Sequence, residues 1–207
     1  MENGRVDSPL TVDADRPGLR ERKKAKTRAL IQQVALRLIR EQGYDATTVE
    51  QIADAAEVSP STFFRYFPAK EDVVIYDALD PLVVEAFLAQ PADASPIAAA
   101  RAAMHSVFGA LNQEQRDEQR ERSVLAFAVP ELQAALIRQV METGRWFGEA
   151  IAERVSRPPD DLAVRVFVGA MTGALLAALI PAVDDPEADW VALMDRAFDL
   201  VEAGLPL

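Results

Sequence analysis

The sequence contains no cysteine and only one histidine, His105, among its 207 residues. The lack of cysteine excludes a disulfide framework, a thiol nucleophile and a cysteine-ligated metal. A single histidine excludes a metal site built from several histidines and disfavours a histidine-based catalytic triad. We therefore expect no resident metal and no cofactor, and we assign no catalytic residue.

Long apolar runs are almost absent. The first 18 residues are polar and lack the apolar stretch that a signal peptide needs. One uncharged run, residues 166–183, just reaches the length of a membrane span, but it is rich in alanine and glycine and lies among charged, amphipathic stretches. We interpret this run as a helix buried between its own core and a partner. The expected protein is cytoplasmic and has no membrane contact.

Basic residues are fewer than acidic ones, 22 against 33, and the formal net charge is −11. That average opposes a nucleic-acid partner, but the charge is unevenly distributed. Residues 16–70 carry 11 basic and 6 acidic side chains, whereas residues 71–207 carry 10 basic and 23 acidic ones. Such asymmetry indicates a nucleic-acid or anion contact in the basic part. The densest basic run comprises Arg20, Arg22, Lys23, Lys24, Lys26 and Arg28.

Apolar residues recur at helical spacing through most of the chain, and helix-capping residues separate the stretches. The first stretch ends at Gly43, a typical C-cap. Thr47 and Glu50 fit a capping box, and Ser59-Pro60 fits the N-cap and first position of a further helix. The expected helices cover residues 24–42, 48–56, 60–67, 70–90, 96–112, 117–129, 130–156, 160–181 and 186–203.

No stretch alternates polar and apolar residues for long, and no hairpin signal occurs. The sequence therefore predicts an all-α fold of about nine helices, in which a three-helix head precedes a larger helical body. We expect a disordered arm over residues 1–18, a helix-turn-helix DNA-binding domain over 19–68, and a ligand-binding and dimerisation domain over 69–207.

Two short helices joined by a three-residue turn, residues 48–67, form the arrangement that places a second helix in the major groove of DNA. Helical spacing leaves Ser61, Thr62 and Arg65 on the outer face of that helix, where they can reach bases or phosphates. The amides at the helix N-termini can hold phosphate oxygens. The basic run that precedes them can follow the DNA backbone or enter a minor groove.

A longer pattern extends over residues 22–76. It consists of Gly43-Tyr44, Thr47-Thr48-Val49, Ile52-Ala53, Ala56, Val58-Ser59 and Thr62-Phe63-Phe64-Arg65-Tyr66-Phe67-Pro68-Ala69-Lys70-Glu71-Asp72. In order and spacing these residues resemble the DNA-binding head of the tetracycline-repressor (TetR) family of bacterial regulators. The rest of the chain resembles that family in length and helicity.

The resemblance implies that DNA is faced by Pro60, Ser61, Thr62, Phe64 and Tyr66. It also implies that Thr47 and Thr48 lie beside the DNA backbone and that Lys70 meets a phosphate. With the helical spacing and the basic run included, the expected DNA-binding residues are Arg20, Arg22, Lys23, Lys24, Lys26, Arg28, Thr47, Thr48, Ser59, Pro60, Ser61, Thr62, Phe64, Arg65, Tyr66 and Lys70.

Three positions depart from the family pattern. Glu57 stands where glycine is usual in the turn, and a left-handed backbone there costs roughly 1 kcal/mol more for glutamate than for glycine. Phe64 replaces a frequent tyrosine and loses a hydroxyl that could bind a phosphate. Tyr66 replaces a frequent histidine and could restore one such bond.

The resemblance also implies a ligand cavity between the body helices, and such cavities are mostly apolar. The expected ligand-binding residues are Phe87, Met104, His105, Phe108, Phe127, Trp146, Phe147 and Met171, although each apolar one could equally belong to the core. His105 is included because a histidine can titrate near neutral pH. Small residues in the run 166–183 would let a second helix approach closely, as in a two-fold dimer. The expected interface residues are Phe167, Gly169, Ala170, Gly173 and Ala177.

These features predict a ligand-responsive DNA-binding transcriptional regulator. We expect a homodimeric repressor that binds a palindromic double-stranded operator and is released by a small-molecule effector. Two alternatives stay open at this point. One is a helical enzyme that uses a cavity carboxylate with a raised pKa. The other is a protein-interaction scaffold whose helix-turn-helix no longer binds DNA.

Overall fold

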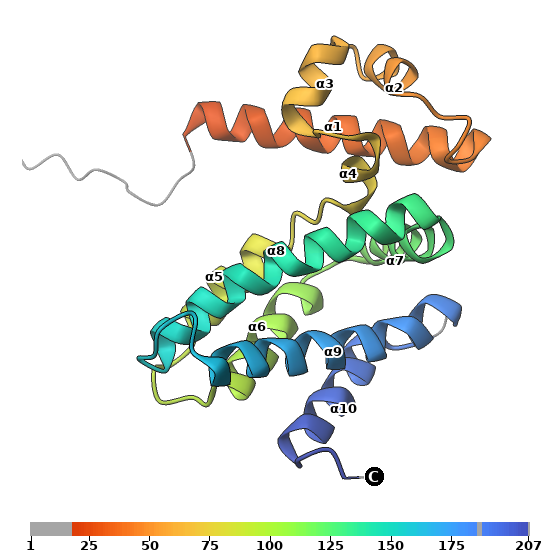
Figure 1. Cartoon of the computed structure of the whole chain (residues 1–207). Helices are drawn as coiled ribbons and strands as arrows, with labels where there is room; N and C mark the ends of the chain where they lie inside the picture. The colour runs from red at the N-terminus through yellow and green to blue at the C-terminus, as the bar shows by residue number, and fades with distance from the viewer. Residues whose placement is uncertain (1–17, 186–187, 207) are drawn as a thin grey trace, which may run out of the picture.

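The computed structural model describes residues 18–185 and 188–206, which form ten helices and no strand (Figure 1). The helices are α1 Leu19–Gln42, α2 Val49–Ala55, α3 Pro60–Tyr66, α4 Lys70–Ile75, α5 Asp80–Leu88, α6 Pro96–Gly109, α7 Gln113–Ala128, α8 Pro130–Arg154, α9 Leu162–Asp184 and α10 Trp190–Glu202. The all-α prediction is confirmed. Residues 1–17 of the expected disordered arm lie outside the described residues.

The tenth helix arises because the expected helix over residues 70–90 is two helices. α4 ends at Ile75, and α5 begins at Asp80 with Pro81 in its first turn. Proline lacks an amide hydrogen and its ring clashes with the preceding turn, so Pro81 favours the start of a new helix over the continuation of α4. In the break, the Asp77 carboxylate accepts a hydrogen bond of 2.8 Å from the Leu79 amide. The prediction of one long helix was therefore wrong.

Side-chain caps begin the two short helices of the head. Ser59 caps α3 as predicted, and its hydroxyl accepts a hydrogen bond of 3.1 Å from the Thr62 amide. The capping box of α2 lies one residue later than predicted, because Thr48 is the N-cap. The Thr48 amide donates to Gln51 Oε1 at 2.9 Å, and the Gln51 amide donates to the Thr48 hydroxyl at 3.2 Å.

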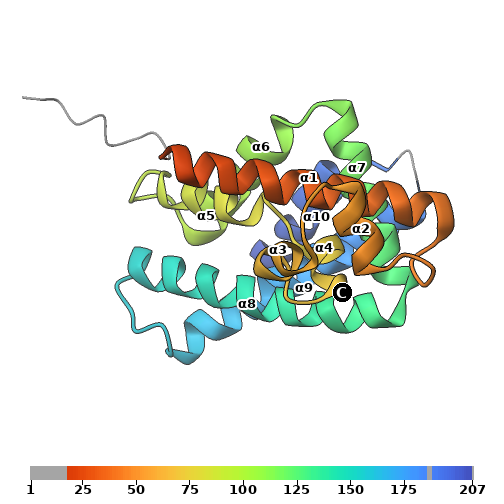
Figure 2. The same ribbon diagram turned by 90° about the horizontal axis from the view of Figure 1, so that it is seen from above.

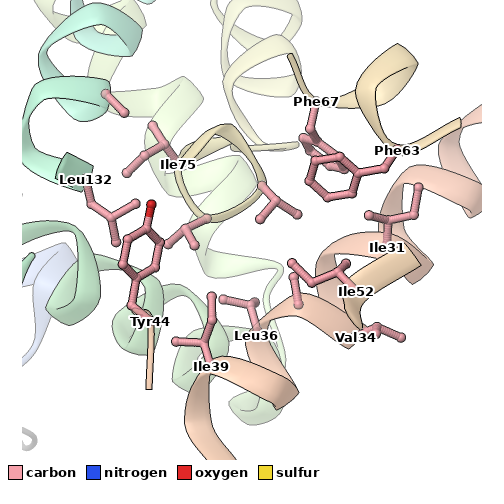
Figure 3. Packing of buried hydrophobic residues seen from close by; sticks show 14 of the residues in the cluster. Ile31, Val34, Leu36, Ile39, Tyr44, Ile52, Phe63, Phe67, Ile75 and Leu132 are labelled. Carbon is pink, nitrogen blue, oxygen red and sulfur yellow. The ribbon is translucent and has the colours of Figure 1, made fainter. Parts of the chain in front are cut away.

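The head is held together by an apolar core between α1, α2 and α3 (Figure 3). Ile31, Ile52 and Phe63, one from each helix, are fully buried, and Phe67 follows directly after α3. The Phe63 and Phe67 ring centroids are 5.8 Å apart. Burying a side chain of this size contributes about 1.5–3 kcal/mol. The packing fixes the inner face of α3 against the head and leaves its opposite face to solvent.

The core of the head continues into the body. Leu132 of α8 and Ile75 of α4 lie near Tyr44, which belongs to the loop between α1 and α2 (Figure 3). α4 packs against α1 on one side and against α7 and α8 on the other. α4 is thus the element that the head and the body share. The boundary predicted at residue 68 stays a prediction.

The body consists of α5–α10 and has its own apolar core. Phe87, Ile151 and Phe198 are buried there, from α5, α8 and α10 respectively. α10 packs along α9 and lies at the end of the body away from the head (Figure 1). Figure 2 looks down on the head and shows the body helices extending beneath it.

α9 is apolar along most of its length but is only partly buried. By length and composition Leu162–Pro181 could span a membrane, a property that core helices of soluble proteins share. Leu162, Val166 and Ile180 are each more than half exposed. This helix therefore presents apolar surface that the rest of the protomer does not cover.

Candidate functional site

The outer face of α3 presents most of the predicted DNA contacts. The exposed or partly exposed residues of α3 and its N-cap are Ser59, Pro60, Ser61, Thr62, Phe64, Arg65 and Tyr66, of which Tyr66 also packs against the head core. Ser59 Oγ lies 2.9 Å from Ser61 Oγ and 3.0 Å from Thr62 Oγ1. These hydroxyls surround the N-terminus of a helix, where the helix dipole and the Ser61 amide favour an anion, whereas the Thr62 and Phe63 amides donate to Ser59. The arrangement suits a DNA phosphate or the edge of a base.

Two larger side chains extend this face. Phe64 is 49% exposed and its ring meets Phe63 edge to face at 5.5 Å. The Arg65 guanidinium lies 5.5 Å from the centroid of the Tyr66 ring. An exposed phenylalanine can contact a thymine methyl, and an arginine can reach guanine or a phosphate. Both residues stay predicted DNA contacts.

Thr47 does not lie where the prediction put it. Its side chain is 1% exposed, and its hydroxyl donates a hydrogen bond of 2.8 Å to the Gly43 carbonyl. The hydroxyl therefore closes the loop between α1 and α2, and the side chain cannot reach a phosphate. Thr48 is exposed at the start of α2 and stays a predicted backbone contact.

The basic run is helical, because α1 begins at Leu19. Its exposed members are Arg20, Arg22, Lys23, Lys24 and Lys26. Positive charges near a helix N-terminus interact unfavourably with the helix dipole, so these basic residues destabilise the first turns of α1. Exposed residues that disfavour the local structure in which they lie are typical of a functional site. The helix thus begins at Leu19 and not at the predicted residue 24, so the run forms a basic helical turn at the start of α1.

Arg28 and Lys70 face the interior of the head. Arg28 donates to the Tyr76 hydroxyl at 3.1 Å, and its guanidinium lies 4.6 Å from the Tyr76 ring. Lys70 Nζ donates to the carbonyls of Tyr44 at 3.0 Å and Thr47 at 3.1 Å, and it lies 3.8 Å from the Tyr44 ring. Both were predicted to contact DNA. In the described structure they fasten α4 and the residue after it to α1 and to the loop between α1 and α2, and their contact with DNA stays a prediction.

Gln32 makes a third such link, which the sequence did not reveal. Its side chain is buried in α1, and Nε2 donates to the carbonyls of Val73 at 3.0 Å and Tyr76 at 2.9 Å. A buried amide without these partners would cost a few kcal/mol, about 1–3 by mutational measurements. A single glutamine within a helical pattern is ordinarily a surface residue, so its spacing gave no signal.

Glu57 occupies the turn between α2 and α3 with a φ of 54°, the left-handed conformation that glycine adopts most easily. The left-handed backbone that strains a glutamate at this position is therefore present. The head tolerates a backbone strain of roughly 1 kcal/mol at this turn.

The body contains a partly open cavity of about 270 Å³, which is lined by residues from α4 to α10. Five of the eight predicted ligand-binding residues line it: Met104, Phe108, Phe127, Phe147 and Met171. Trp190 and Phe198 add further aromatic surface from α10. The volume lies just below the usual range of about 300–1,000 Å³ for ligand sites, and the lining is mostly apolar as in such sites.

The other three predicted residues do not line this cavity. Phe87 is fully buried behind it, with its ring 6.1 Å from that of Phe147. Trp146 is 38% exposed on the outside of α8. His105 is exposed on α6 and pairs with the Asp195 carboxylate at 2.8 Å. Helical periodicity identified apolar residues here but could not separate a cavity wall from the core behind it.

Polar residues gather in the cavity lining, and no sequence pattern revealed them. Asp80 Oδ2 accepts hydrogen bonds from Gln139 at 2.9 Å and Thr143 at 2.8 Å. Asp77 Oδ2 accepts one from Gln119 at 2.9 Å and lies 3.3 Å from Arg122. Burial raises the pKa of Asp80, and the Asp77 carboxylate raises it further. Over residues 18–185 and 188–206, no three His, Cys, Asp or Glu side chains could hold a metal ion together.

The predicted interface residues fall on two faces of α9. Gly169, Gly173 and Ala177 are exposed, in line with exposed Val166 and Ile180. A Cβ added at Gly169 or Gly173 would meet nothing within 4 Å. Ala170 is partly exposed, whereas Phe167 lines the cavity. The structure therefore corrects the assignment of Phe167.

This geometry defines a class of protein. A helix-turn-helix presents the outer face of its second helix, and a helical body behind it contains a mostly apolar cavity. The class is that of ligand-responsive, DNA-binding transcriptional regulators. Residues 31–76 match the family model described as "Bacterial regulatory proteins, tetR family", and residues 94–206 match the model described as "MftR C-terminal domain". The chain belongs to the TetR family of bacterial transcriptional regulators.

Relatives and solved structures agree with this family. The HTH-type transcriptional regulator TcmR of Streptomyces glaucescens is 42% identical over 112 residues, which cover 53% of this chain and half the length of TcmR. MftR of Mycobacterium tuberculosis is 25% identical over 185 residues, which cover 89% of this chain and 93% of MftR. FadR of Thermus thermophilus, a TetR-family repressor solved with lauroyl-CoA, shares the fold with a TM-score of 0.55 at 21% identity, over 87% of this chain and 95% of FadR.

Proposed function

We propose that this protein represses transcription in the bacterial cytoplasm as a homodimer, that it binds a palindromic operator, and that a small molecule in the body cavity releases it. It has no catalytic role in this proposal. The observation that carries it is the position of α4. Val74 and Ile75 line the cavity, while Lys70 of the same short helix donates hydrogen bonds to the loop before α2.

α4 can transmit a change because both of its ends are fastened. Lys70 connects its N-terminus to the loop before α2. Gln32 connects its C-terminal carbonyls to α1. A ligand that displaces Ile75 would therefore shift the head with α4. The ligand can shift the equilibrium between two head positions only by the difference between its affinities for them.

Two copies are needed to place two heads on one operator. The exposed stripe of α9 offers small residues flanked by larger apolar ones, which is the surface that a two-fold helix pairing buries. Two α3 helices held by one dimer would meet half-sites about one helical turn, or 34–36 Å, apart.

Selection of bound duplexes from a randomised pool tests the DNA-binding proposal directly. We expect the purified full chain to enrich an inverted repeat whose half-site centres lie about 10–10.5 base pairs, or a multiple of that, apart. Enrichment of single half-sites, or of no sequence, would contradict a dimeric operator-binding protein.

The basic helical turn should supply sequence-independent affinity. Replacing Lys23, Lys24 and Lys26 by alanine is expected to weaken binding to the selected operator and to random DNA alike. The slope of log affinity against log salt should become shallower by about 0.9 for every phosphate that the variant no longer neutralises. Fluorescence anisotropy at several salt concentrations measures both effects. Arg37→Ala, on the same helix beyond the basic turn, is the control. An unchanged salt slope in the triple variant would remove this turn from the interface.

A further inference from the structure

The polar residues of the cavity leave one carboxylate oxygen open. Asp80 is the first residue of α5, and both of its described hydrogen bonds, from Gln139 and Thr143, reach the same oxygen, Oδ2. Among the described residues no hydrogen bond reaches Oδ1. Asp80 also lines the cavity. A ligand in the cavity could therefore donate to this oxygen.

The charges around Asp80 do not balance. The cavity lining holds two carboxylates, Asp77 and Asp80, but one guanidinium, that of Arg122. Arg122 lies 3.3 Å from Asp77, whose other oxygen accepts the Leu79 amide. Asp77 is thus fully paired, while the hydrogen-bond partners of Asp80 are both neutral. The lining therefore lacks one positive charge to balance Asp80, whose side chain is partly exposed.

Two further observations agree with this deficit. Burial raises the pKa of Asp80, although the hydrogen bonds from Thr143 and Gln139 and the charge of Arg122 act in the opposite direction. The lining also holds aromatic rings from several helices, among them Phe108, Phe147 and Trp190. Aromatic faces attract a cation through their quadrupole.

We propose that the cavity binds a compact, apolar amine whose protonated nitrogen donates to Asp80 Oδ1. The apolar part of the ligand contacts the aromatic wall. The inference rests on the proposed function in one respect, since binding of the amine is expected to change affinity for DNA. The binding itself can be measured without DNA.

Three probes with one apolar body test the charge preference: adamantanemethylamine, adamantanemethanol and adamantanecarboxylate. The protein has two tryptophans, so a Trp146→Phe background leaves Trp190 in the cavity wall as the only one. Quenching or a shift of Trp190 fluorescence reports the affinity for each probe. We expect the amine to bind at least about tenfold more tightly than the alcohol, and the carboxylate to bind most weakly. Equal affinity for amine and alcohol, or tightest binding of the carboxylate, would overturn the proposal.

Asp80→Asn keeps the side-chain shape and an oxygen acceptor for Gln139 and Thr143, but removes the charge. In this variant the preference for the amine over the alcohol should disappear while affinity for the alcohol stays within about threefold. Asp195→Asn is the matched control, because Asp195 pairs with Arg101 and His105 outside the cavity lining. An amine preference that persists in Asp80→Asn would show that a residue other than Asp80 binds the amine. If that variant fails to fold, the three probes on the parent protein still decide.

DNA binding is measured in a separate arm on the selected operator. An amine that binds the cavity but leaves operator affinity unchanged would overturn its role as effector and leave the site intact. A chain that binds the operator but shows no amine preference would overturn the site and leave the regulator intact.

Discussion

Ser61→Glu is expected to abolish operator binding while the head stays folded. Ser61 is exposed at the second position of α3, beside the N-cap Ser59. An acidic side chain in the first turn of a helix interacts favourably with the helix dipole, by about 0.3–1 kcal/mol. The variant should therefore unfold at the same temperature as the parent or slightly higher.

The same charge would face the DNA phosphates. Like charges brought together at an interface cost several kcal/mol, so we expect operator affinity to fall by about 100-fold or more. Ser61→Ala, which removes only the hydroxyl, should cost about tenfold or less. Ser106→Glu makes the same change on the exposed side of α6 in the body and should leave affinity unchanged. Anisotropy titrations and thermal unfolding of the three variants check this. Near-parental operator affinity in Ser61→Glu would exclude α3 as the recognition helix.

The helices of the head were predictable because local signals agree there. Ser59-Pro60 marks the start of α3, and Gly43 ends α1 with a φ of 87°. Where two capping signals overlap, the local sequence cannot distinguish between them. Thr47 with Glu50 and Thr48 with Gln51 both fit a capping box. Only the burial of Thr47 within the loop between α1 and α2 decides between them.

The split between α4 and α5 was predictable in principle but was missed. Pro81 stood in the sequence as a helix-breaking residue, and apolar periodicity on both sides of it concealed the break. The consequence is functional, because the break frees α4 to be a six-residue helix shared by the head and the body.

The polar part of the cavity could not have been found from spacing. Asp80, Arg122 and Gln139 come from α5, α7 and α8, and no local pattern links them. Each alone resembles an ordinary surface residue of an amphipathic helix. His105 drew attention as the sole histidine, yet it lies on the surface beside Asp195. Rarity in the sequence was a poorer guide to the site than three-dimensional proximity.

The second large effect concerns the pairing of two protomers. Gly173→Arg is expected to make the protein monomeric and to reduce operator affinity by about 100-fold or more, because one head alone loses the gain from binding two half-sites at once. A Cβ at this position meets nothing within 4 Å, and arginine favours a helix over glycine by nearly 1 kcal/mol, about 0.8. The isolated protomer should therefore become more stable, not less.

In a two-fold pairing through α9, the two introduced arginines would be desolvated near one another without partners, which opposes association. Gly109→Arg is the matched control, since Gly109 is also exposed with no atom within 4 Å of an added Cβ, but lies at the end of α6. That variant should stay dimeric and bind the operator like the parent. Sedimentation velocity gives the assembly state, and anisotropy gives the affinity. Because Gly173→Arg raises protomer stability while it removes pairing, a loss of DNA binding in this variant cannot come from unfolding. A dimer that persists in Gly173→Arg, with operator affinity unchanged, would place the interface on another face.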